Sequence, residues 1–436
     1  MKKKIDLIMR KKIEKLFTGI ILIILVASFS IGFLSVGGFS TDVDGSSFFA
    51  PNLSAQDTFW PGNSSEWTEV APEDQGLNSS KISEMFEFIN SSQIDIHSVV
   101  IVRNGYLITE EYLYNSDIYR NLEGEKEYYG GHKVHMQMST TKSIIAILIG
   151  IALQEGFLDN ISQTLYEFYA DIWEPTFIDS EQKKNITIEQ LLKMNAGFNG
   201  GGAGYPPDAK TKLDVDCINF ALNEVPLSNN PGTEGVFEYS NDGPNLLSGI
   251  IANVTGNSTE EFAREYLFEP LGILEEETFW WNDSKGMDFG GYGLDCSPKV
   301  QAKLGMLALN EGAWNGIQIV EPNFIIDATT PQIYGYGYLI WMVASPFEGY
   351  SFIGAGGQCV YVIPEYNIVV GFTASDDPYY GPIITDYILN NIVDPPGNQI
   401  PPQDPLIPGF SLNVIFLTIF CVSAVLIIKK KKYSKN

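Results

Sequence analysis

The sequence is poor in cysteine, histidine and positive charge. Four cysteines and three histidines in 436 residues are too few for a disulfide-built scaffold. Lys and Arg number 27 against 53 Asp and Glu, which gives a net charge of −26. So acidic a surface repels polyanions, and we predict no nucleic-acid partner. The hydrophobic fraction of 44% nevertheless predicts a substantial buried core.

The scarce cysteines and histidines also limit the chemistry of a site. Three cysteines lie outside an apolar run that contains the fourth, and ordinary buried thiols are expected for them, although Cys296 and Cys359 could form a bridge. His132 and His135 share the spacing of one helix face, but no third ligand is near. We predict no metal and no cofactor. A Ser-His-Asp triad is not expected, because no Gly-x-Ser-x-Gly elbow occurs.

Positive charge gathers at the two chain ends, each time beside an apolar run. The basic tails 1–15 and 429–436 carry about +5 each, which leaves about −36 between them. Residues 16–36 predict a transmembrane anchor or a cleaved signal peptide, and residues 409–428 predict a transmembrane helix. Because positive charge marks the cytoplasmic side, we expect a cell-membrane protein with both termini inside, or with a cleaved N-terminus, and the intervening part outside the cell.

Between these runs the pattern predicts a linker over 37–58, one folded domain over 59–393 and a stiff proline-rich stalk over 394–408. An exterior location makes N-glycosylation a further expectation. The acceptor asparagines are Asn52, Asn63, Asn78, Asn90, Asn160, Asn185, Asn253, Asn257 and Asn282.

Strand patterns occur at both ends of the predicted domain, and helical patterns lie between them. This arrangement predicts an α+β fold in which the terminal strands share one antiparallel sheet beside a helical region. The predicted strands cover 98–102, 106–112, 359–363 and 367–373, and the predicted helices cover 81–89, 143–153, 188–194, 245–254, 259–267, 298–309 and 383–392.

The first candidate for chemistry is Ser139-Thr140-Thr141-Lys142, which opens an apolar helix. Residues i and i+3 lie on one helix face, so the hydroxyl and the amine can meet. Apolar surroundings lower a lysine pKa and supply a neutral amine as a base. The alternative is an N-cap serine with a solvated lysine one turn later. A second Ser-x-x-Lys, from Ser180 to Lys183, is interpreted as a charged loop without such a helix.

Two later segments complete the candidate site. In Tyr239-Ser240-Asn241 the phenol could relay protons, and the amide could hold the lysine and a substrate carbonyl. The glycines of Gly354-Ala355-Gly356-Gly357-Gln358 would allow backbone N–H groups to approach a substrate oxygen. Taken singly, the first segment could be an ordinary turn before a helix, and the second a glycine-rich hairpin entry.

Together and in this order, the three segments resemble the serine β-lactamase and penicillin-binding-protein superfamily. The Tyr-x-Asn form is similar to class C β-lactamases and to related esterases and aminohexanoate-oligomer hydrolases. The resemblance implies an antiparallel sheet flanked by helices next to an all-helical region, and an acyl-enzyme on Ser139. Lys142 and Tyr239 would share the acid–base work, and the N–H groups of Ser139 and Ala355 would hold the oxyanion, with Gly354, Gly356 and Asn241 beside them.

One departure from the family pattern shapes the expected substrate. The third motif of the family is usually Lys-Thr-Gly or His-x-Gly. In this sequence the corresponding residues are Phe352-Ile353-Gly354, which lack the cation that would bind a substrate carboxylate. We therefore expect a membrane-anchored serine hydrolase for a small ester, amide or short peptide-like substrate. The alternatives are a β-lactamase or penicillin-binding D-Ala peptidase, and an inactive surface binding module. The sequence does not specify an oligomeric state.

Overall fold

The computed structural model describes residues 59–61, 67–92, 94–113, 118–120, 126–128, 134–199, 216–375 and 378–393. The predicted tails, membrane spans, linker and stalk, at 1–58 and 394–436, lie outside these residues. Within the described ranges no helix has both the length and the apolar character that crossing a bilayer requires.

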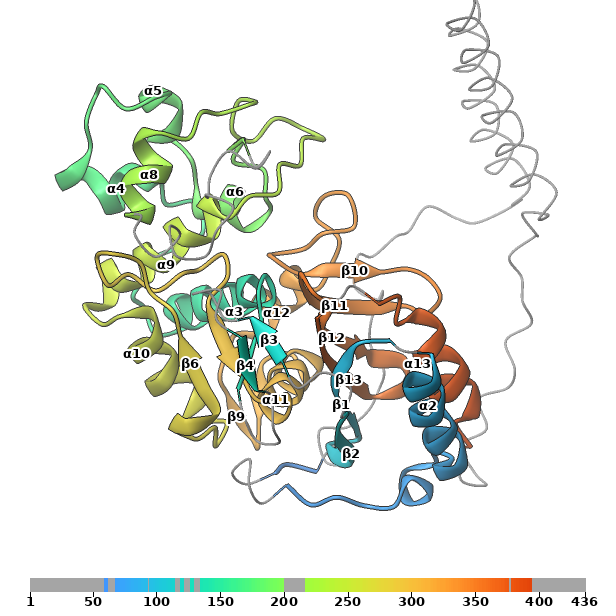
Figure 1. The fold of residues 1–436 in the computed structure, drawn as a ribbon. Coiled ribbons are helices and arrows are strands. Elements are labelled where there is room, and N and C mark those ends of the chain that lie inside the picture. Colours follow the sequence, from blue (N-terminus) through green and yellow to red (C-terminus); the bar gives the residue numbers. More distant parts are fainter. Residues whose placement is uncertain are drawn as a thin grey trace, which may run out of the picture. The chain divides into compact units, whose positions relative to one another are not determined.

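A six-stranded antiparallel sheet forms the centre of the domain (Figure 1). Its strand order is β10-β11-β12-β13-β1-β2, so the first strand of the domain pairs with the last. This confirms the prediction that strands from both ends share one antiparallel sheet. The strands are β1 (Ile96–Arg103), β2 (Tyr106–Tyr112), β10 (Trp341–Val343), β11 (Gly349–Gly354), β12 (Gln358–Ile363) and β13 (Ile368–Ala374).

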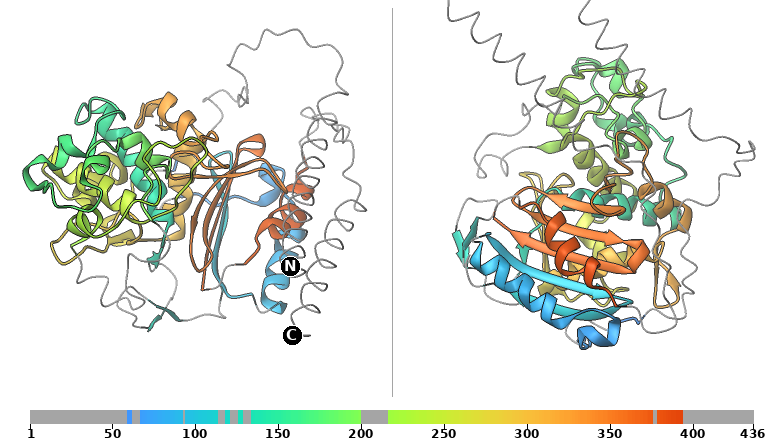
Figure 2. Two further views of the ribbon diagram at one scale, coloured as in Figure 1. Left: turned by 90° about the horizontal axis from the view of Figure 1, so that it is seen from above. Right: turned by 90° about the vertical axis from the view of Figure 1, so that its right-hand side faces the viewer.

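Helices cover both faces of this sheet. On one face lie α2 (Ser79–Ser91) and α13 (Gly381–Tyr387), whose apolar side chains share a core with residues of β1, β12 and β13 (Figure 2). On the other face α11 (Pro298–Leu309) packs against β1, β12 and β13. A sheet that is buried on both sides explains why all eight residues of β1 are buried.

The helical region surrounds α3 (Thr140–Gln154), which packs against α9 (Asp242–Thr255) and against β11. Residues 140–152 of α3 are buried on every side, as the uniformly apolar sequence predicts. The other helices are α4 (Leu165–Tyr169), α5 (Ser180–Lys183), α6 (Ile188–Leu192), α8 (Cys217–Asn223), α10 (Thr259–Ala263) and α12 (Pro322–Ala328). Short strands form three further sheets: β3 (Ile118–Arg120) with β4 (Lys126–Tyr128), β5 (His135–Met136) with β7 (Leu294–Cys296) and β6 (Thr278–Trp280), and β8 (Ala313–Trp314) with β9 (Ile317–Gln318).

Three predicted α-helices end earlier than expected. The helix predicted over 259–267 ends at Ala263, and a π-helix over Arg264–Phe268 continues it. The helix predicted over 188–194 stops at Leu192, because Met194 has a left-handed φ of 53° that an α-helix cannot accommodate. The helix predicted over 383–392 ends at Tyr387, and a 3₁₀ turn at Leu389–Asn391 follows it. Cys217, Cys296 and Cys359 are buried and not joined in a disulfide, so the conceivable Cys296–Cys359 bridge is not formed.

Candidate active site

The N-terminus of α3 brings Ser139 and Lys142 together. Ser139 directly precedes the first helical residue, and Lys142 lies one turn later on the same face. The Lys142 Nζ atom is 3.0 Å from the Ser139 Oγ atom. Because α3 is buried all round, the Lys142 side chain is only 1% exposed. The alternative of an N-cap serine with a solvated lysine is therefore wrong, and Ser139 makes no side-chain cap bond.

The remaining contacts of Lys142 fix the orientation of its amine. Nζ lies 2.6 Å from the Asn241 side-chain oxygen and 2.5 Å from the Gly291 carbonyl oxygen. A neutral amine has two hydrogens and one lone pair. If Asn241 and Gly291 accept the two hydrogens, the lone pair remains for the hydroxyl proton of Ser139. The geometry thus suits an amine that accepts a proton from Ser139.

The charge of Lys142 is set by two opposing effects. Burial disfavours the ammonium form, whereas the Asp242 carboxylate favours it. Burial is the larger effect, and the pKa of Lys142 falls from 10.5 to about 7. A substantial fraction of the lysine is therefore neutral at physiological pH.

Tyr239 reaches the same serine from the segment that leads into α9. Ser139 lies close enough to act on the pKa of the Tyr239 phenol, and Lys142 Nζ lies 4.9 Å from the centre of the Tyr239 ring. Burial raises the pKa of Tyr239, so the phenol keeps its proton at neutral pH and can donate it. Trp341 stacks on the Tyr239 ring with a centroid distance of 5.8 Å, and this contact fixes the plane of the ring.

The glycine-rich hairpin between β11 and β12 approaches the segment before Ser139. A Cβ atom placed on Gly354 would lie 2.1 Å from the Gln137 carbonyl oxygen, so only glycine fits there. Gly356 has a left-handed φ of 77°, which also favours glycine. Within the described part of the chain, the backbone N–H groups of Ser139 and Ala355 have no recorded acceptor. Both N–H groups are therefore available to a ligand.

The third-motif positions carry no cation. Phe352 is completely buried in the main core, and Ile353 packs against the core beneath α2 and α13. Neither side chain can form an ion pair, so these positions offer no cation to a substrate.

Sequence reasoning missed two contributors to the site. The Gly291 carbonyl lies in the glycine-rich segment 290–293, but nothing in the residue type signals its bond to Lys142. Asp242 directly follows Asn241 and is only 3% exposed; a charged residue at the start of an otherwise apolar helix is a signal that could have been noticed. Tyr292, which directly follows Gly291 in the chain, is buried and stacked on Phe289.

The second Ser-x-x-Lys segment differs from its interpretation as a charged loop. It forms α5, and Lys183 is fully buried, with Nζ 2.9 Å and 2.8 Å from the carbonyl oxygens of Ala221 and Leu222 near the end of α8. Ser180 Oγ accepts a hydrogen bond from the Trp173 indole. Among the described contacts no hydrogen bond joins Ser180 to Lys183. We therefore interpret both residues as stabilising the fold and not as a catalytic pair.

The two histidines in the described part of the chain, one in β1 and one in β5, form a buried pair. The Nδ1 atom of His97 lies 2.8 Å from the Nε2 atom of His135. Burial lowers the pKa of His135 to about 3, with a smaller contribution from His97, so His135 is neutral. His132 lies outside the described residues. Among the residues that the structure describes, no group of three or more His, Cys, Asp or Glu side chains could hold a metal ion.

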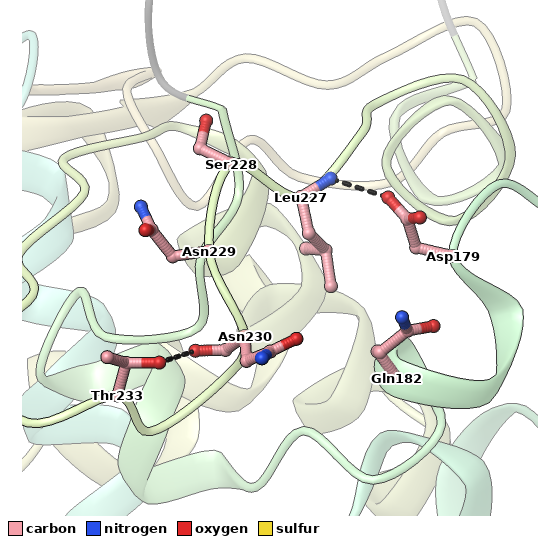
Figure 3. A pocket seen from close by; sticks show the side chains of 7 residues that line it. All are labelled: Asp179, Gln182, Leu227, Ser228, Asn229, Asn230 and Thr233. Atoms are coloured by element: carbon pink, nitrogen blue, oxygen red, sulfur yellow. Dashed lines mark hydrogen bonds between the residues drawn. The ribbon is translucent and has the colours of Figure 1, made fainter.

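Two hollows open on the helical region, and neither includes a predicted catalytic residue. One, of about 390 Å³, has polar walls from α5 and from the loop after α8 (Figure 3). The other, of about 610 Å³, lies between the segment 167–172 and residues of α8 and α9. The residues of the first hollow are Asp179, Gln182, Leu227, Ser228, Asn229, Asn230 and Thr233.

Comparison with known proteins agrees with this geometry. The Beta-lactamase family model matches residues 88–298. Protein flp of Staphylococcus aureus (strain N315) is 27% identical over 216 residues, which are 47% of this chain and 39% of that protein. The 6-aminohexanoate-dimer hydrolase of Paenarthrobacter ureafaciens is 21% identical over 269 residues, 56% of this chain and 67% of that enzyme.

Structural comparison extends the match over more of the domain. A family VIII carboxylesterase superposes on this structure with a TM-score of 0.55 at 15% sequence identity. The superposition covers 74% of this chain and 99% of the esterase chain. The chain thus has the fold of these hydrolases, although its match spans only about two fifths of the staphylococcal protein. The family model and these relatives confirm the resemblance to the serine β-lactamase and penicillin-binding-protein-like superfamily that the order of the three motifs predicts.

Proposed function

We propose that the protein is a serine hydrolase that cleaves a small ester or amide through an acyl-enzyme on Ser139. Neutral Lys142 accepts the hydroxyl proton of Ser139 as Oγ attacks the substrate carbonyl carbon. A bond forms between Oγ and that carbon, and the carbonyl oxygen becomes an oxyanion. As this intermediate collapses, Tyr239 donates a proton to the departing alcohol or amine, and Lys142 returns a proton to Tyr239.

Deacylation uses the same groups with water in place of Ser139. As water attacks the acyl carbon, Tyr239 accepts one of its protons and passes its own proton to neutral Lys142. When the bond to Ser139 Oγ breaks and the acid leaves, that proton returns to Ser139 Oγ. The free N–H groups of Ser139 and Ala355 support a role in holding the oxyanion in both steps. Asn241 would keep the lysine aligned through its 2.6 Å contact.

One observation carries this proposal: a buried amine with a pKa of about 7 lies 3.0 Å from a serine hydroxyl and 4.9 Å from the centre of a buried phenol ring. The uncharged third-motif positions and the acidic chain further favour a substrate without a carboxylate at that edge. The hydrolases among its relatives and structural neighbours support ester or amide cleavage.

The test is covalent labelling of the folded protein with a fluorophosphonate, together with turnover of a nitrophenyl ester. We expect both in the wild type and a loss of about a thousandfold or more in Ser139→Ala. Ser180→Ala is the matched control, because it removes the serine of the other Ser-x-x-Lys segment. A folded wild-type protein that takes no label would contradict the proposal and favour the binding-module alternative. Stable acylation by labelled penicillin would favour the penicillin-binding alternative.

We also propose that the domain is held at the outer face of the cell membrane by the apolar runs 16–36 and 409–428. The basic tails beside both runs support cytoplasmic termini. Protease added to intact cells should remove the domain but leave a tag on either terminus protected. If the N-terminal segment is cleaved, only the C-terminal tag remains detectable.

A further inference from the structure

A buried carboxylate that the proposed reaction does not use directly follows the asparagine that contacts the catalytic lysine, and its charge acts on that lysine. Asp242 is the first residue of α9, directly after Asn241, whose side-chain oxygen contacts Lys142 Nζ. The Asp242 side chain is 3% exposed, and its Oδ1 atom is buried without a hydrogen-bond partner in the described part of the chain. An unpaired carboxylate costs stability unless a nearby charge compensates it.

The charges that face Asp242 come from three elements. Lys142 approaches from α3 and Lys183 from α5, and both ammonium groups favour the ionised carboxylate. Tyr292, which neighbours Cys217 and Asp283, approaches from the segment after β6 and keeps its proton because burial raises its pKa. The pKa of Asp242 rises from 3.8 to about 6, mainly because of burial, so the carboxylate is mostly ionised at pH 7.

This position gives Asp242 a consequence for catalysis. A general base works best when its pKa lies near the working pH. Burial alone would push the pKa of Lys142 further down and leave a weak base, whereas the Asp242 charge opposes that fall. Among the residues that the structure describes, Asp242 is the one carboxylate whose charge acts on Lys142.

We propose that Asp242 is a positioning residue. Its negative charge sets the equilibrium between the protonated and the neutral amine of Lys142, and so determines the pH at which Ser139 becomes reactive. The inference rests on the proposed serine-hydrolase function. Asp242 touches no reacting atom, and it acts through the amine that receives the Ser139 proton.

The experiment measures the pH dependence of Ser139 acylation by a fluorophosphonate in the wild type and in Asp242→Asn. The acid limb of the rate profile is the low-pH range in which the acylation rate rises as Lys142 loses its proton. Loss of the negative charge should move this limb to lower pH by about one unit or more, and should lower the maximum rate reached above it. Asp242→Glu keeps a charge and should restore the limb toward its wild-type position. Asp242→Ser is a second neutral variant in case the amide does not fold.

Asp288→Asn is the matched control. Asp288 is buried to a similar extent, but its carboxylate accepts a hydrogen bond from the Glu260 N–H rather than facing Lys142. This variant should leave the acid limb unmoved even if the protein melts earlier. An unmoved limb in folded Asp242→Asn or Asp242→Ser would overturn the inference while leaving the serine-hydrolase function intact. A wild type without acylation would overturn both.

Discussion

The two Ser-x-x-Lys segments make an instructive pair, because their lysines share burial but differ in contacts. Lys142 and Lys183 are 1% and 0% exposed, and burial lowers their pKa values to about 7 and about 8. The amine of Lys142 faces a serine hydroxyl and a phenol ring. The amine of Lys183 binds two backbone carbonyls near the end of α8.

The difference teaches that a lowered lysine pKa does not by itself define a catalytic amine. A buried lysine can serve a helix end, where its hydrogens satisfy carbonyls that the helix leaves open. A catalytic lysine must in addition keep its lone pair directed at a group that gives up a proton. The segment around α3 meets this condition, and the segment around α5 does not.

The largest effect expected from this comparison is on activity. Lys142→Met should lower the rate of fluorophosphonate labelling by about a thousandfold or more, because no base remains for Ser139. Lys183→Met should leave the rate per folded molecule within about threefold of the wild type. Labelling rates of the two variants, normalised to folded protein by circular dichroism, make the measurement. Equal losses in both variants would remove the distinction.

A smaller effect is expected from the phenol. Tyr239→Phe keeps the ring that stacks on Trp341 but removes the proton relay, so ester turnover should fall by about a hundredfold to ten-thousandfold. Tyr336→Phe is the matched control, since Tyr336 packs in the same aromatic group with centroids 6.4 Å apart but lacks a recorded bond to Ser139. If Tyr336→Phe lost as much activity, packing rather than proton transfer would explain the result.

Both buried lysines should affect how the free energy of unfolding depends on pH. The unfolded chain protonates lysine up to about pH 10.4, whereas the folded chain releases the Lys142 proton near pH 7 and the Lys183 proton near pH 8. Between these limits the unfolded state binds more protons, so stability rises with pH by about 1.4 kcal/mol per unit for each lysine. Urea unfolding from pH 6 to pH 10 should show a shallower rise in Lys142→Met, with the deficit beginning near pH 7, and in Lys183→Met, with the deficit beginning near pH 8.

The smallest effect is expected at the second serine. Ser180→Ala removes the acceptor of the Trp173 indole hydrogen bond, and the free energy of unfolding should fall by about 1 kcal/mol. Activity should be unchanged, because Ser180 lies outside the candidate site. Chemical denaturation, monitored through tryptophan fluorescence, measures the change. A large activity loss here would show that the two segments are coupled.

Much of the fold was predictable because its signals are local. Pro298–Leu309 forms a helix with the predicted bounds, since Ser297 caps it and Pro298 suits its first turn. The strands β10 and β11 were not predicted. They lie in a segment rich in glycine and aromatic residues, in which apolar and polar residues do not alternate. The strands form because β11 pairs with its neighbour β12 in the folded sheet.

The residues of the candidate site that belong to sequence motifs could be predicted. Ser139, Lys142, Tyr239 and Asn241 are brought together by the structure, although their catalytic roles remain a proposal. The Gly291 carbonyl could not be found from residue type, because a backbone oxygen acquires its role only through tertiary approach. The buried state of Lys183 was missed for the same reason: its partners lie 38 and 39 residues further along the chain.

The pairing of β1 with β13 has a consequence for biosynthesis. Ile96 opposes Ala374, so the middle of the sheet is closed by segments made almost 280 residues apart. During translation β1 and β2 can form a hairpin early, but β1 keeps one unpaired edge until residues 368–374 have left the ribosome. The nascent chain therefore exposes an apolar strand edge through most of its synthesis. Chaperone binding to β1 before release is the protection that this topology calls for.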